Sequence, residues 1–298
     1  GSVDCDLLPV TVDRALDRSG DVGSHLALAL RADQRPFLAY HDETNGNLKI
    51  HDCADAACTS GTRRTLDTTG DVGQSVAVAI GPTGLPFIAY RDATAQTLKA
   101  YACANAACTS GSVRTLDASV NVGNAVAMAL RSDGRPLVAY VDFTAFRLRL
   151  YDCDNTACSS GVIRNTTGTS VPYGLSITMR ADDRALIALG GNAGAAVRVR
   201  TYDCADIGCT TGTQRLISDV NYSPSVALVM RGNGRPLLVT AGDFSSLRVN
   251  DCADAVCTTT TQVAFDTDTT DTVGAALRPD GRPIVAFGKR HAPQDLRV

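Results

Sequence analysis

The sequence predicts an all-β fold of six repeated units, each a four-stranded antiparallel sheet. One observation is that no stretch of ten or more residues has helical periodicity. Another is the motif C-x4-C, whose first cysteine recurs with a period of about fifty residues, at Cys53, Cys103, Cys153, Cys204 and Cys252. The third is a short apolar run of the type RPFLAY, found at 35–40, 85–90, 135–140, 235–240 and 282–287, with a degenerate copy at 184–189. Units of about fifty residues with four strands are typical of blades, so we expect a six-bladed β-propeller.

Each unit shows four strands in the same order. The first is short and almost wholly apolar, as at 25–31, which suits a strand buried on both faces. A two-residue turn such as Asp133-Gly134 predicts a type I′ hairpin, and the second strand begins at the proline that follows. The third strand, as at 48–53, alternates apolar and polar residues, and the fourth, as at 62–67, is polar like an edge strand.

One domain is expected over 3–298, because the repeats account for the whole chain after a Gly1-Ser2 pair typical of a cloning scar. The chain ends on Leu296-Arg297-Val298 and begins on Val3-Asp4-Cys5, and joined tail to head these match LRVNDC at 247–252. We therefore expect both termini to close the last blade, which leaves no open sheet edge. The predicted blades are 22–67, 72–117, 122–167, 172–217, 222–266 and 271–298 plus 3–17.

The composition excludes several classes of protein. With 44% hydrophobic and 20% charged residues, the chain is typical of a globular protein. A net charge of −3 gives no electrostatic case for a nucleic-acid partner. No apolar run approaches the roughly 18 residues of a membrane helix, so no transmembrane segment is expected.

The cysteine pairs favour disulfides over zinc. Each C-x4-C lies where the third strand turns into the fourth, so its two thiols can meet across one hairpin. Zinc typically takes four ligands, and pairs on separate blades could not readily share an ion. The predicted disulfides imply a secreted, periplasmic or cell-surface location. The predicted disulfide pairs are Cys53–Cys58, Cys103–Cys108, Cys153–Cys158, Cys204–Cys209 and Cys252–Cys257. Cys5 has Val10 at the position of a partner cysteine, so it is either a free buried thiol or an intermolecular link.

Candidate ligand-binding residues lie on the face that carries the loops between second and third strands and between blades. These loops vary more between copies than the strands do, and variable loops on a constant scaffold are the usual place for recognition. The candidates are His25, His41, Asp42, Arg91, Asp92, Asp142, Tyr173, Tyr222, Lys289, Arg290 and His291.

Asp42, Asp92 and Asp142 follow the second strand in three successive blades. They could form a carboxylate crescent for a cation or a polyhydroxylated ligand. Alternatively, each Asp caps its own loop, as Asx turns do. The second interpretation is favoured. The second strand lies about 4.8 Å outside the first, so equivalent positions on neighbouring blades are too far apart to chelate one ion.

The histidines suggest a polar pocket. His25 and His41 belong to blade one and Lys289–His291 to the adjacent blade six, so together they could supply a base and an anion clamp near the mouth of the channel. Unpaired surface histidines are the commoner case. Tyr173 and Tyr222 could offer apolar ligand contacts or pack in the core, and His51 is expected to be solvated on an outer strand.

Arginines flank the first turn in most repeats, as at Arg31/Arg35 and Arg131/Arg135. A ring of guanidinium groups could bind anions. Aspartates recur beside them, as at Asp52 and Asp152, which favours structural ion pairs instead.

The six copies together resemble β-propeller repeat proteins, in particular secreted bacterial ones whose blades are stapled by cysteines. No catalytic signature accompanies this resemblance. The sialidase Asp box S-x-D-x-G-x-T-W needs a tryptophan, and the chain has none. G-x-S-x-G and H-E-x-x-H are also absent.

The sequence thus favours a non-enzymatic extracellular binding module whose ligand, a carbohydrate or another protein, lies on the loop face. The alternative is a hydrolase or lyase of the six-bladed lactonase type, with a polar or calcium site at the channel mouth. A third interpretation is a scaffold that packs on another domain of a larger surface protein. We expect a monomer. No cofactor is expected for the binding module, and calcium is expected only for the lactonase-type alternative.

Overall fold

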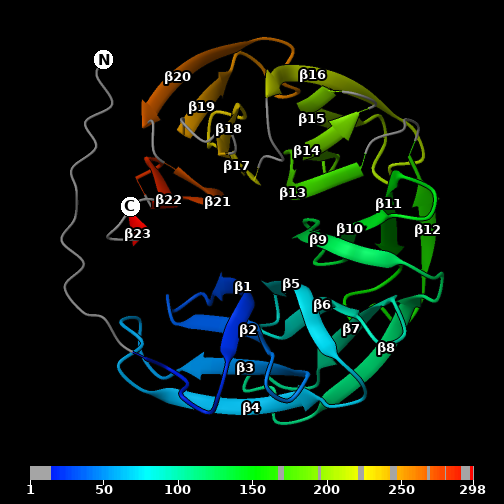
Figure 1. Cartoon of the computed structure of the whole chain (residues 1–298), viewed down its shortest axis with the longest axis vertical. Coiled ribbons are helices and arrows are strands. Elements are labelled where there is room, and N and C mark those ends of the chain that lie inside the picture. The colour runs from blue at the N-terminus through cyan, green and yellow to red at the C-terminus, as the bar shows by residue number, and fades with distance from the viewer. Residues whose placement is uncertain are drawn as a thin grey trace.

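The computed structural model describes residues 15–166, 171–193, 196–220, 225–241, 247–266, 269–278, 280–289 and 296–297. These residues form strands, turns and loops and contain no helix, so none of them belongs to a helix that could cross a membrane. The strands make six antiparallel sheets, or blades, arranged around a ring (Figure 1). The all-β, six-sheet prediction is confirmed.

Blades one to three are the most regular. Each is a meander in which sequence neighbours pair. They contain β1 (Val22–Leu30), β2 (Pro36–Asp42), β3 (Asn47–Cys53) and β4 (Gly61–Asp67); β5 (Val72–Ile80), β6 (Pro86–Asp92), β7 (Thr97–Cys103) and β8 (Gly111–Asp117); and β9 (Val122–Leu130), β10 (Pro136–Asp142), β11 (Arg147–Cys153) and β12 (Gly161–Asn165).

Blades four to six follow the same plan. They contain β13 (Val171–Met179), β14 (Ala185–Ala193), β15 (Ala196–Cys204) and β16 (Gly212–Val220); β17 (Ser225–Met230), β18 (Pro236–Ala241), β19 (Leu247–Cys252) and β20 (Thr260–Asp266); and β21 (Thr269–Leu277), β22 (Pro283–Lys289) and β23 (Leu296–Arg297). Blade six has three strands in the described residues, with Leu296 paired to Gly288 as the start of a third strand. The part of its predicted closure that falls on residues 3–14, including Cys5, lies outside the described residues.

The first strand of each blade is innermost, and consecutive first strands contact one another from β1 to β21 (Figure 1). The apolar core lies between blades. Phe37, Leu48 and Ile50 of blade one are fully buried against Val72 and Ile88 of blade two. Blades two to six repeat this contact. Because each blade buries its apolar face on the next, the ring depends on contacts about fifty residues apart.

The first turn differs from the predicted type I′ hairpin. Arg131 donates its backbone N–H to the Arg135 carbonyl at 3.0 Å, and Gly134 donates to the Arg131 carbonyl at 2.8 Å. The loop therefore has three residues, and only Gly134 has a positive φ, 81°. Asp133 instead accepts the backbone N–H of Arg135 at 2.9 Å. A type I turn followed by one left-handed residue explains this geometry, and the I′ prediction is wrong.

Candidate ligand-binding site

The loop face is the end of the ring where second strands finish and first strands begin. Thr44 donates its N–H to the Asp21 carbonyl, Ala93 to that of Asp71, and Phe143 to that of Asn121. These bonds tie each loop that enters a blade to the loop between its second and third strands. The side chains at the strand ends are therefore held on a fixed frame.

Two positions on this face change from blade to blade while their neighbours repeat. Val22, Val72 and Val122 are constant, but two residues later stand Ser24, Gln74 and Asn124. Asp42, Asp92 and Asp142 are constant, but the residue before each is His41, Arg91 or Val141. Ser24 pairs with His41 and Gln74 with Arg91, each beside a register shift in the ladder. We call these six residues, Ser24, His41, Gln74, Arg91, Asn124 and Val141, the variable positions.

In blade one, the variable positions join a chain of three polar groups. The Ser24 hydroxyl lies 3.4 Å from His41 Nδ1, and His41 Nε2 lies 2.7 Å from the Asp71 carboxylate. His41 is only 3% exposed. Asp71 comes from the loop between β4 and β5, and its other oxygen accepts the Gln74 side-chain N–H at 2.9 Å. Asp71 thus links the variable positions of blades one and two.

His25 and Arg91 flank this chain. The His25 ring centroid lies 6.1 Å from that of His41, with the rings tilted by 52°. Partial burial and the neighbouring His41 lower the pKa of His25. Burial also lowers the pKa of the half-buried Arg91 guanidinium, against the attraction of Asp71 and Asp92. Its Nε has no hydrogen-bond partner among the described residues. Because Nε is buried, donor capacity for a ligand rests with the terminal guanidinium nitrogens of Arg91, which make no hydrogen bond or ion pair with a described residue.

Asp42, Asp92 and Asp142 are buried and engaged within their own blades. Asp42 accepts the Asn45 N–H at 3.1 Å and pairs with Lys49 at 2.8 Å. Asp92 accepts the Ala95 N–H at 2.8 Å and pairs with Lys99 at 2.7 Å, and Asp142 likewise caps Ala145 and pairs with Arg149. Burial opposes ionisation of Asp42, but bonds from Lys49 and Asn45 outweigh it and lower its pKa. This is the loop-capping arrangement.

The remaining candidates lie apart from His41 or outside the described residues. Tyr173 begins blade four, is 49% exposed and meets Phe143 edge to face at 6.1 Å. Lys289 ends β22, and its side chain is outside the described part. Tyr222, Arg290 and His291 also lie outside it. The structure thus brings His25, His41 and Arg91 together around Asp71, a residue that sequence reasoning missed although its loop position carries Asp21 and Asn121 in neighbouring blades.

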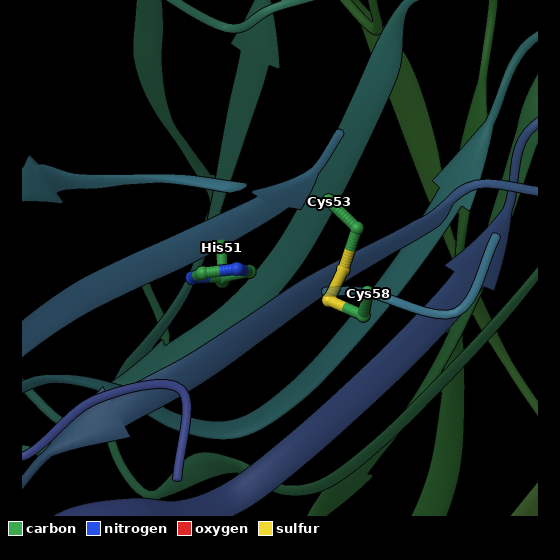
Figure 2. Close-up of side chains that lie close together, drawn as sticks. All are labelled: His51, Cys53 and Cys58. Carbon is green, nitrogen blue, oxygen red and sulfur yellow. A yellow bond between two sulfur atoms is a disulfide. The ribbon is translucent and has the colours of Figure 1, made fainter. Parts of the chain in front are cut away.

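The cysteine pairs are all disulfides, with Cα atoms 4.7–4.9 Å apart. Figure 2 shows the first, Cys53–Cys58, beside His51, and no other group of three metal-ligand side chains occurs in the described residues. The sulfur atoms of Cys53 and Cys58 are bonded to each other, so they are not free thiolate ligands for a metal. His51 is 5% exposed, so its predicted solvation is wrong. It is enclosed because it faces Gly61, as Tyr101 faces Gly111 in blade two.

The arginines of the first turns make ion pairs. Arg31 bonds to Asp52 at 3.0 Å and reaches the Ala106 carbonyl of blade two. Arg131 pairs with Asp152 at 2.7 Å, Arg180 with Asp203 at 2.8 Å, and Arg231 with Asp251. The structural interpretation of this pattern agrees with these contacts.

No protein-family model matches the sequence, and no curated protein does. Solved structures match its fold. AofleA from Arthrobotrys oligospora is 11% identical with a TM-score of 0.61, over 93% of this chain and 84% of that chain. The SapL1 lectin, solved with alpha methyl fucoside, is 11% identical with a TM-score of 0.62, and the match covers 91% of this chain and 94% of that chain. A mutant of the Aleuria aurantia lectin, solved with Fucalpha1-6GlcNAc, is 13% identical with a TM-score of 0.61, over 91% and 89%. At these identities the likeness shows a shared fold, the β-propeller that the repeats predict.

Proposed function

We propose that this protein is a carbohydrate-binding module whose ligand lies against the variable positions of blades one to three. The observation that carries the proposal is the break in the repeat. Residues that the scaffold needs recur from blade to blade, whereas Ser24, His41, Gln74, Arg91 and Asn124 do not. Since blades one to three fold alike with different side chains at these positions, we attribute the differences to recognition.

The chemistry of these side chains suits a polyhydroxylated ligand. Hydroxyl, imidazole, amide and guanidinium groups supply both donors and acceptors for sugar hydroxyls. Arg91 contributes a half-buried guanidinium that makes no ion pair with a described residue. Lectins solved with fucose-containing ligands share the fold, which makes a fucoside the first ligand to test. Five disulfides fit a secreted, periplasmic or cell-surface protein, where glycans are met.

The test is a glycan array probed with the full chain, followed by calorimetry with the retained glycan and with alpha methyl fucoside. Arg91→Val copies the residue of blade three and should weaken binding about tenfold or more, because a charge-assisted hydrogen bond is lost. Arg135→Leu copies Leu85 of blade two on the opposite face and should leave the affinity unchanged. An array without a retained glycan overturns the proposal, and an unchanged affinity in Arg91→Val overturns the assigned site.

A further inference from the structure

The polar chain of blade one has the order of a nucleophile, a base and an orienting carboxylate. Ser24 Oγ lies 3.4 Å from His41 Nδ1, and His41 Nε2 lies 2.7 Å from Asp71. With the Nε2 proton held by Asp71, Nδ1 is the acceptor that faces the Ser24 hydroxyl. Such a constellation is recognised by geometry and roles and not by sequence position, and its first contact is often long before substrate binds.

We propose that Ser24 is a nucleophile for acyl transfer, with His41 as general base and acid and Asp71 as the residue that positions His41. The substrate class is an O-acyl ester of a polyhydroxylated compound, a choice that rests on the proposed function. The reaction is ester hydrolysis through an acyl-Ser24 intermediate.

The scaffold gives no reason for this triad. The matching residues are Gln74, Arg91 and Asn121 in blade two, and Asn124 and Val141 in blade three. Neither set contains a nucleophile next to a base, yet both blades fold in the same way. Ser24, His41 and Asp71 come from three different segments and form the hydrogen-bonded series only at blade one, so packing alone does not account for them.

The backbone beside Ser24 is bulged. Ladder pairs are Ser24 with His41 and then Ala27 with Ala39, so the step between them is irregular. His25 in this step has a φ of 51°. The same irregularity lies between Gln74 and Ala77 in blade two, so the bulge belongs to the scaffold and re-aims whichever side chain stands there.

The steps balance without a further reactant except water. The Ser24 hydroxyl proton moves to His41 Nδ1 as Oγ bonds to the ester carbonyl carbon. The tetrahedral intermediate collapses, the ester C–O bond breaks, and the leaving alcohol takes the proton from His41. Water then attacks the acyl carbon and gives its proton to His41. The bond to Ser24 breaks, Oγ regains the proton, and the carboxylic acid leaves.

The test uses probes that contain no sugar, so it is independent of glycan binding. The full chain is treated with a fluorophosphonate, and the adduct is located by peptide mass spectrometry. We expect the adduct on Ser24 and not on Ser75, which lies at the equivalent bulge of blade two without a histidine. Hydrolysis of 4-nitrophenyl acetate should fall roughly 100-fold or more in Ser24→Asn and His41→Val, which copy blade three and preserve the fold.

Asp71→Asn copies Asn121 and should slow both labelling and hydrolysis without moving the adduct. Absence of label on Ser24, or hydrolysis unchanged in His41→Val, overturns the triad. Labelling in a protein that retains no glycan upholds the nucleophile and rejects the carbohydrate substrate. Glycan binding without labelling of Ser24 upholds the carbohydrate-binding module and rejects the nucleophile, so the two proposals fail separately.

Discussion

The Tyr90 hydroxyl donates a 2.7 Å hydrogen bond to Asp67, and this buried contact joins blade two to the last residue of β4 in blade one. Both residues are 5% exposed or less. Lys99 lies 3.6 Å from Asp67 and 2.7 Å from Asp92, so one ammonium group connects both carboxylates. Tyr40 with Asp17 and Tyr140 with Asp117 repeat the contact at 2.8 and 2.7 Å. Apolar packing between blades is thus supplemented by a polar contact that fixes their register.

Tyr90→Phe should lower the free energy of unfolding by about 1–3 kcal/mol, because a buried carboxylate loses a donor. The measurement is urea denaturation followed by circular dichroism. Tyr101→Phe is the matched control, since Tyr101 is also buried but its hydroxyl has no hydrogen bond to a described residue. Equal losses in the two variants would show that the Tyr90 hydrogen bond contributes nothing specific.

His51→Tyr should stabilise the protein. Both ring nitrogens of His51 are buried without a partner, and blades two to four carry tyrosine at this position. Burial and, secondarily, Arg63 lower the pKa of His51, so unfolding takes up a proton once the pH falls below about 6.5. The free energy of unfolding of the wild type should therefore decrease as the pH falls from 7 towards 5, because the unfolded state binds this proton and the folded state does not. The variant should lose less stability than the wild type over this range in urea denaturation, whereas parallel pH profiles would contradict the idea.

The repeat made the fold predictable, but it hid most contacts between blades. The cysteine spacing and apolar runs are local signals, so the hairpins and disulfides follow from them directly. His41 and Asp71 are 30 residues apart and meet only when blade two docks on blade one. His51 shows the same limit: alternation along β3 suggests a half-exposed strand, but the facing Gly61 lets the ring lie in a buried position. In both cases the decisive contact lies outside the local pattern.

Blade two lacks the ion pair of the first turns, and a cavity marks its place. Gly81 stands where other blades have arginine, and Ala102 where they have aspartate. Both line a cavity of about 50 Å³ together with Thr83 and Leu130. Restoring both charged residues should fill the cavity, whereas restoring one leaves a buried charge unpaired.

We expect Gly81→Arg to destabilise the protein and Gly81→Arg/Ala102→Asp to recover that loss, with a coupling of about 1–3 kcal/mol in a double-mutant cycle. Thermal denaturation of the four proteins gives the coupling. Additive effects of the two substitutions would show that positions 81 and 102 do not form an ion pair equivalent to that of Arg31 and Asp52.

The last prediction concerns the face that blade one turns away from blade two. Leu26, Leu28 and Leu30 are 55%, 54% and 53% exposed, whereas Val76, which matches Leu26 in blade two, is 8% exposed. Three leucines on one face of a strand, each already about half buried, would gain about 1 kcal/mol each if the rest were covered, so a cover is expected. Blade six is the repeat that belongs there, and the N-terminal residues are predicted to complete it.

Arg278 corresponds to Arg31, and Asp4 precedes Cys5 as Asp52 precedes Cys53, so closure should pair Asp4 with Arg278. Asp4→Arg should therefore lower the melting temperature, because it places two guanidinium groups together. The charge swap Asp4→Arg/Arg278→Asp should restore most of the loss, as expected for a pair in contact. Asp21→Arg, at an exposed loop position on the opposite face, is the control and should change the melting temperature little. If the swap fails to rescue Asp4→Arg, residues 3–17 do not close the ring in this register.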